Sequence, residues 1–161
     1  MMDIHLTQPF LKPKSIAIIG ASADPKKTGS RIQRFLVAHG YKGKIFPVNP
    51  NRDNIFGLKC YSNLKKIEEK VDHIFIAVDG DKIIASINDA ISIGVKCATI
   101  LSGGFSEVGL QGANLENKIL DIAQKGNLRI LGPNSIGIIN ISDSVILSAN
   151  AMLELPKLKK G

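Results

Sequence analysis

The stretch SIAIIGASADPKKTG, residues Ser15–Gly29, decides the fold class. It begins with a short apolar run, Ser15–Gly20, which is typical of a strand buried on both faces. The run stops on a glycine, and eight small, polar or basic residues then lead to Gly29. In the next segment, Ser30–Gly40, apolar residues recur at the spacing of a helix with one buried face. A strand, a glycine-bounded turn and a helix in this order predict an α/β unit.

The same order of strand and helix recurs along the chain. The predicted strands are Ser15–Gly20, Lys44–Val48, His73–Val78, Lys96–Leu101, Arg129–Leu131 and Ile136–Ile141. The predicted helices are Ser30–Gly40, Asn63–Lys70, Lys82–Ile93 and Gly112–Lys125. Repeated strand–helix units joined by right-handed crossovers predict a Rossmann-like, doubly wound α/β fold, with a mostly parallel sheet and helices on both faces.

The composition limits the class of protein and its partners. A chain of 161 residues is long enough for one domain with its own core. The charge of +7 favours anionic partners, but with 5% aromatic residues and no tryptophan we expect no nucleic-acid binding. No apolar run approaches the roughly 20 residues that span a bilayer, so we expect no membrane contact. The two cysteines, Cys60 and Cys97, lack metal-ligand spacing and predict reduced thiols in a cytoplasmic protein.

The loop after the first strand has the features of a phosphate site. Backbone N–H groups and the positive dipole end at the start of the following helix favour an anion. Gly20 permits a tight turn, and Gly29 lets a ligand approach the backbone. Hydroxyl and ammonium groups are supplied by Ser22, Lys26, Lys27, Thr28 and Ser30. The alternative is an ordinary connection in which Thr28 or Ser30 only caps the helix.

The loop after the second strand indicates which kind of phosphorylated ligand the site would bind. NAD-binding domains usually have an acidic residue at this tip, where it binds the ribose hydroxyls. Here the strand ends in Val48-Asn49-Pro50 and Arg52 follows. An arginine without an acid favours a ligand with a further phosphate, such as NADP or a nucleotide phosphorylated on its ribose. The alternative is a solvated turn, because Asn-Pro-Asn is turn chemistry by itself.

The remaining loops and histidines supply no catalytic group. Ser102, Gly103 and Gly104 follow the fourth strand and leave backbone N–H groups and space for a chain-like group. The acids Asp79 and Asp81 predict a polar turn with a helix cap, with a magnesium role as the alternative. None of the three histidines, which are His5, His39 and His73, lies in a candidate ligand loop. We therefore expect no catalytic constellation and no metal site.

Four stretches, taken in order, resemble a known family. They are PKSIAIIGASADPKKTGSRI, GYKGKIFPVNPNRDNIFGLKCY, GVKCATILSGGFSEVGLQG and LRILGPNSIGIIN, which together cover nearly everything from Pro13 to about Ala151. They are similar to the CoA-binding domain of NDP-forming (ADP-forming) acyl-CoA synthetases and, more distantly, to the alpha subunit of succinyl-CoA synthetase. The resemblance implies CoA or acyl-CoA as the ligand.

The resemblance also implies a role for each loop. The turn after the first strand would bind the CoA phosphates through Ser22, Lys27, Thr28 and Gly29. Arg52 would contact the nucleotide, with Asn49 and Pro50 shaping the turn. Ser102, Gly103 and Gly104 would border the pantetheine arm, and the turn from Gly132 to Asn134 would lie near the thiol. The Asp79-Gly80-Asp81 segment departs from the proline-containing turn of the family.

The resemblance also implies how the chain is divided into domains and that catalysis needs further domains. Residues 1–12 would be an N-terminal extension, 13–151 the CoA-binding domain and 152–161 a linker to a second domain. The synthetases transfer phosphate through a histidine in a following domain and use an ATP-grasp domain, and none of the three histidines matches it. We therefore expect a part of an acid–thiol ligase that binds but does not catalyse alone. The alternatives are a stand-alone or acetyltransferase-linked CoA-binding regulator and an NADP-binding oxidoreductase domain.

Overall fold

A parallel sheet of five strands forms the centre of the structure, a computed structural model that describes residues 4–154. Its strands are β1 (Ser15–Ile19), β2 (Lys44–Val48), β5 (His73–Ile76), β6 (Cys97–Ile100) and β7 (Arg129–Leu131). They lie in the order β2-β1-β5-β6-β7, and every neighbouring pair is parallel. The prediction of a doubly wound α/β sheet is confirmed.

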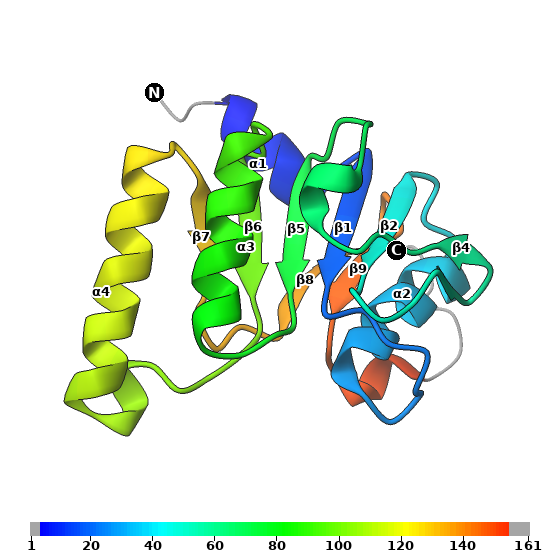
Figure 1. Cartoon of the computed structure of the whole chain (residues 1–161). Helices are drawn as coiled ribbons and strands as arrows, with labels where there is room; N and C mark the ends of the chain where they lie inside the picture. The colour runs from blue at the N-terminus through cyan, green and yellow to red at the C-terminus, as the bar shows by residue number, and fades with distance from the viewer. Residues whose placement is uncertain (1–3, 155–161) are drawn as a thin grey trace.

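Both faces of the sheet are covered, as Figure 1 shows. Helices α3 (Asp81–Ser92) and α4 (Leu110–Lys125) cover one face, and α2 (Thr28–Ala38) packs on the other. Successive side chains of a strand point to opposite faces. Accordingly Ala17 and Ile19 of β1 join the core under α3 and α4, whereas Ile16 and Ile18 join the core under α2. The unbroken apolar run that predicted β1 is therefore explained by burial on both sides.

The strand predicted at Ile136–Ile141 exists but lies outside the central sheet. It forms β8 (Gly137–Asn140), which pairs antiparallel with β9 (Val145–Ser148) in a separate hairpin. The side chains of β9 are buried and pack beside α2. Sequence analysis missed β9, a four-residue strand that covers the sheet in place of a helix.

Three further elements differ from the prediction. The region 63–70 contains only a single 3₁₀ turn, η1 (Leu64–Lys66), instead of the predicted helix Asn63–Lys70. Within that range only Leu64 and Ile67 are buried, which is too little apolar surface to hold an otherwise polar helix. A short hairpin of β3 (Asn54–Ile55) and β4 (Leu58–Lys59) and an N-terminal helix, α1 (Ile4–Leu11), were not predicted.

The short remaining elements are η2 (Ser106–Val108) and η3 (Ala151–Glu154). Most of the linker expected at residues 152–161 lies outside the described residues. Within the described part of the chain, no helix combines the length and the apolar character needed to cross a membrane.

The strand order determines where a ligand can bind. In chain order the five parallel strands are arranged 2-1-3-4-5, so the connections that follow β1 and β5 run toward opposite edges of the sheet, and the switch point lies between these two strands. Open α/β sheets bind ligands outside the carboxyl ends of the strands at such a switch point. The carboxyl ends of β1 and β5 are therefore the place to look for a site.

His73 joins the opposite, amino-terminal end of the sheet to α1. The side chain is fully buried, with Nδ1 3.0 Å from the carbonyl oxygen of Pro9 and Nε2 2.9 Å from Oγ1 of Thr99. Burial lowers the pKa of His73 to about 4, so the ring is neutral at pH 7. In the neutral ring Nδ1–H donates to Pro9, and Nε2 accepts from the Thr99 hydroxyl.

Acidification is expected to destabilise the fold through His73. An unfolded histidine binds a proton near pH 6.5, whereas the folded one does so only near pH 4. The unfolded state therefore binds more protons in this window, and stability falls as the pH falls through it, by about 3 kcal/mol. Urea unfolding at pH values from 7 to 4.5 checks this, with His73→Gln as the non-titrating control. An equally steep pH dependence in the variant would assign the effect to other groups.

Candidate functional site

A pocket of about 550 Å³ lies at the switch point. Its walls come from the end of β1 with the loop to α2, the tip of β2, the end of β5, the segment before η1 and the first turns of α3. Of the twelve residues predicted for the site, the pocket is lined by Gly20, Lys27, Asn49 and Pro50. Two loops that are far apart in sequence, those after β1 and β2, are thus brought together.

Two glycines set the close contact between β1 and α2. Gly20 has φ +83°, and a Cβ on it would lie 2.6 Å from the carbonyl oxygen of Ala77 at the end of β5. A Cβ on Gly29 would lie 2.1 Å from the carbonyl oxygen of Gly20. The space at Gly29, which we expected a ligand to use, is therefore filled by the backbone of Gly20. This contact holds the start of α2 directly against the end of β1.

The loop between the two glycines is shaped by its own hydrogen bonds. The Ser22 hydroxyl accepts from the Asp24 N–H at 3.1 Å, and the Asp24 carboxylate accepts from the Lys26 N–H at 3.0 Å. The N-cap residue of α2 is Lys27, and no side chain caps this helix. The alternative in which Thr28 or Ser30 serves only as a cap is therefore not what the structure has. The first N–H groups of α2 are left without a side-chain acceptor, as an anion site requires.

Asn49 ties the tip of β2 to this loop. Its amide nitrogen donates to the carbonyl oxygen of Ala21 at 2.8 Å, and its amide oxygen accepts from the Asn51 N–H at 2.9 Å. The backbone N–H of Asn49 also donates to the carbonyl oxygen of Tyr61 at 2.9 Å. One side chain thus fixes the distance between two walls of the pocket.

Replacing Asn49 by aspartate is expected to loosen the site. The new carboxylate can still accept from Asn51, but it faces the carbonyl oxygen of Ala21 with no proton to donate. The lost hydrogen bond and the repulsion are expected to cost about 1–3 kcal/mol. Urea unfolding of this variant beside Asn51→Asp, which makes the same chemical change at an exposed position, measures the effect. Equal stability of the two variants would show that the Asn49 amide does not join the loops.

Arg52 lies beyond the edge of the pocket. Its backbone N–H donates to the carbonyl oxygen of Asn49 at 3.4 Å, and the residue is exposed. Within residues 4–154 the guanidinium forms no ion pair. Arg52 therefore follows the tip of β2 as expected, with its charge available to a ligand that extends past the rim.

The loops after β6 and β7 meet beside the end of β5. The Ser102 hydroxyl donates to the carbonyl oxygen of Val78 at 2.7 Å, and the Asn134 N–H donates to the carbonyl oxygen of Ser102 at 3.0 Å. Val78 lines the pocket, whereas Ser102, Gly103, Gly104 and Asn134 do not. These residues form a neighbouring ledge that is joined to the pocket wall by the Ser102 hydroxyl.

Glu107 accepts a hydrogen bond from the backbone of this ledge. One carboxylate oxygen of Glu107 lies 2.7 Å from the Gly104 N–H. The pKa of Glu107 is held below its usual range by backbone N–H groups, first its own and then those of Gly104 and Phe105. The expected free N–H group at Gly104 is thus occupied by a carboxylate, which makes the ledge unsuitable for an anion and compatible with an uncharged chain. Phe105 is buried in the core with residues of α3 and α4.

Sequence reasoning missed the wall of the pocket that follows Tyr61 in the chain. Ser62, Asn63 and Leu64 line the pocket because the chain at Tyr61 forms a parallel bridge to Val48 at the tip of β2. No local pattern signals a single bridge of this kind. From α3, Lys82 and Asp89 also line the pocket.

The two acids that follow β5, Asp79 and Asp81, differ in their position relative to the pocket. Asp79 lines the pocket, whereas Asp81 begins α3 and does not. Among residues 4–154 no group of three or more His, Cys, Asp or Glu side chains could hold a metal ion. The pocket is of mixed charge, because Lys27 and Lys82 line it together with Asp79 and Asp89.

Comparison with known proteins identifies relatives of this fold and site. Residues 14–141 match the family described as "CoA binding domain". Acetate–CoA ligase (ADP-forming) II of Archaeoglobus fulgidus is 42% identical over 149 residues, which are 92% of this chain and 22% of the relative. The alpha subunit of acetate–CoA ligase (ADP-forming) II of Pyrococcus furiosus is 37% identical over 131 residues, which are 81% of this chain and 28% of the subunit.

A solved structure agrees with the sequence comparisons. The dinucleotide forming acetyl-coenzyme A synthetase 1 of Ca. Korarchaeum cryptofilum, in complex with phosphate and ADP, superposes with a TM-score of 0.84 at 38% identity. The match covers 88% of this chain and 30% of that one. The present chain therefore spans less than a third of the length of each of these relatives.

Proposed function

The chain belongs to the family of CoA-binding domains, and on this premise we propose that its pocket holds the nucleotide end of CoA. The observation that carries the proposal is the convergence of the loops after β1 and β2 on one pocket at the switch point, joined by the Asn49 amide. Both loops carry basic residues beyond their strand ends, Lys27 in the first and Arg52 in the second. The proposed binding unit is residues 13–151.

The pyrophosphate of CoA would lie at the start of α2. The N–H groups there have no side-chain cap, and the helix dipole is positive at this end. Lys27 lines the pocket and would add a charge, while Ser22 and Thr28 would supply hydroxyl groups. Gly20 and Gly29 would contribute by holding α2 against β1, so that these groups face the pocket.

The 3′-phosphate of the ribose would be bound by Arg52. The tip of β2 has no carboxylate to bind free ribose hydroxyls, and Asn49 and Pro50 form the pocket wall there. A guanidinium beyond the rim can reach a phosphate that projects from the pocket toward solvent.

The pantetheine arm would cross the ledge formed by Ser102, Gly103, Gly104 and Asn134. The arm is uncharged, which suits a ledge where the Glu107 carboxylate already holds the Gly104 N–H. This course takes the arm away from the phosphate loop along the carboxyl ends of β5 and β6.

The chain would act as the CoA-binding part of an ADP-forming acid–thiol ligase. The full reaction is acyl-CoA + NDP + phosphate ⇌ acid + CoA + NTP, and it needs a phosphohistidine domain and an ATP-grasp domain or subunit as partners. His39 and His73 are both buried within this fold and do not line the pocket. Both cysteines, Cys60 and Cys97, are buried, which is compatible with a cytoplasmic protein.

Fragments of CoA test this assignment. Adenosine 3′,5′-bisphosphate carries the ribose phosphate without the arm, and pantetheine carries the arm without phosphate. We expect adenosine 3′,5′-bisphosphate to displace CoA and pantetheine to compete far more weakly, because the charged contacts lie in the nucleotide part. Lys27→Gln should weaken CoA and the bisphosphate, whereas Lys118→Gln, an exposed change on α4, should not. Competition by pantetheine alone would contradict the assignment.

A further inference from the structure

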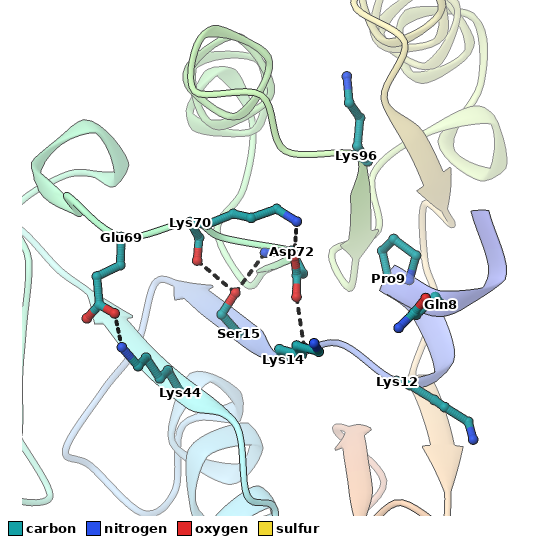
Figure 2. A pocket seen from close by; sticks show the side chains of 10 residues that line it. All are labelled: Gln8, Pro9, Lys12, Lys14, Ser15, Lys44, Glu69, Lys70, Asp72 and Lys96. Carbon is teal, nitrogen blue, oxygen red and sulfur yellow. Dashed lines mark hydrogen bonds and ion pairs between the residues drawn. The ribbon is translucent and has the colours of Figure 1, made fainter. Parts of the chain in front are cut away.

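A second cavity lies at the opposite, amino-terminal edge of the sheet. It has a volume of about 640 Å³, and Figure 2 shows it between α1 and the starts of the strands. Among the residues that the structure describes, five lysines and two carboxylates line it, a net charge of +3. The lysines are Lys12, Lys14, Lys44, Lys70 and Lys96. The proposed CoA pocket lies at the other end of the strands and shares no lining residue with this cavity.

The cavity has an ordered polar floor. Ser15, which is 5% exposed, donates its hydroxyl proton to the carbonyl oxygen of Lys70 at 2.8 Å. The same hydroxyl oxygen accepts from the Asp72 N–H at 2.9 Å. The Asp72 carboxylate in turn accepts from the backbone N–H of Lys14 at 2.8 Å and pairs with the Lys70 ammonium at 3.1 Å. These bonds, drawn in Figure 2, fix the chain segments from which the lysines project.

The carboxylates of the cavity are already neutralised. Glu69 pairs with Lys44, and Asp72 pairs with Lys70 and the Lys14 N–H. Lys12 pairs with Asp143, outside the cavity. Lys14 and Lys96 form no ion pair with any described residue. Their two ammonium groups therefore remain to attract an anion, at a cavity whose described lining carries an excess of positive charge.

We propose that this cavity binds a compact phosphate anion that carries two or more negative charges. Lysine ammonium groups are mobile point charges that suit phosphate oxygens in several directions. Among the described residues no aromatic side chain lines the cavity, so these residues offer no platform for a nucleotide base. The hydrogen-bonded floor of Ser15 and Asp72 gives the site a fixed shape, which distinguishes it from an ordinary patch of surface lysines.

Calorimetric titration with inorganic pyrophosphate tests the proposal. The 161-residue chain is first saturated with CoA, which occupies the phosphate loop after β1. We expect saturable 1:1 binding of pyrophosphate under these conditions. The double variant Lys14→Gln/Lys96→Gln should bind about tenfold more weakly. The control Lys118→Gln/Lys125→Gln removes the same charge from α4 and should bind as the parent does.

Three outcomes would overturn the proposal. They are the absence of saturable pyrophosphate binding, an equal loss of affinity in the α4 control, and equally tight binding of citrate, which would show attraction by charge without preference for phosphate. CoA binding by the Lys14→Gln/Lys96→Gln variant should equal that of the parent, which shows that the variant is folded. Because that titration reports on the other pocket, failure here is distinguishable from failure of the proposed CoA site.

Discussion

Replacing Gly29 by alanine is expected to lower the free energy of unfolding by about 3 kcal/mol and to abolish measurable CoA binding. The new Cβ would lie 2.1 Å from the carbonyl oxygen of Gly20, so backbone must move. Either α2 shifts away from β1 or the end of β1 shifts toward β5, where Gly20 is itself in contact with Ala77. Both movements displace the N–H groups proposed to bind the CoA phosphates. Urea unfolding and calorimetry with CoA measure the two effects.

Gly94→Ala is the matched control for this change. Gly94 has φ +79°, but a Cβ there would meet no atom within 4 Å. Alanine in this conformation is expected to cost about 1 kcal/mol through backbone strain alone. It lies after α3, away from the pocket, and should leave CoA binding unchanged. If Gly29→Ala were as stable as this control and bound CoA normally, the contact between Gly20 and Gly29 would not position α2.

The substitution Arg52→Ala is expected to weaken CoA binding by about 10- to 100-fold. The lost interaction is a charge-assisted hydrogen bond to phosphate, worth about 1.5–3 kcal/mol. Dephospho-CoA lacks the 3′-phosphate, so its affinity should change by less than about twofold. Calorimetric titration of both ligands against parent and variant measures this difference. Lys118→Ala removes one exposed positive charge elsewhere and corrects for the change in overall charge.

An equal loss of affinity for CoA and dephospho-CoA would show that Arg52 acts elsewhere, for example on the pyrophosphate. No loss for either ligand would leave the exposed Arg52 as a solvated turn residue, the alternative that the sequence allowed. Both results contradict the assignment of the 3′-phosphate.

Most of the sheet was predictable from sequence because every residue of β1, β5 and β6 is buried, on both faces. Continuous apolar runs such as Ser15–Ile19 identify such strands, and helical periodicity identified α2, α3 and α4 between them. The hairpin of β8 and β9 was only half predicted, because one partner was recognised and the pairing was not. The helix expected at residues 63–70 does not form, because a mostly polar segment has too little apolar surface to pack against the core.

The loops that form the site were predictable from the sequence, but the distances and contacts between them were not. The rule that ligands bind at the carboxyl ends of parallel strands led to Gly20, Lys27 and Asn49, which the fold does bring to one pocket. No spacing in the sequence encodes distances across the fold. The close contact of Gly29 with Gly20 and the hydrogen bond from the Gly104 N–H to Glu107 depend on such distances. The roles given to the twelve residues in binding CoA stay predictions.

Calorimetric titration of the 161-residue chain with CoA, dephospho-CoA, NADP and NAD is the direct test of whether this pocket binds CoA. We expect saturable 1:1 binding of CoA, weaker binding of dephospho-CoA and still weaker binding of both dinucleotides. CoA should be preferred because its pyrophosphate, its 3′-phosphate and its uncharged arm each meet a matching part of the carboxyl edge. No binding of CoA at high protein concentration, or tighter binding of NADP than of CoA, would contradict the account.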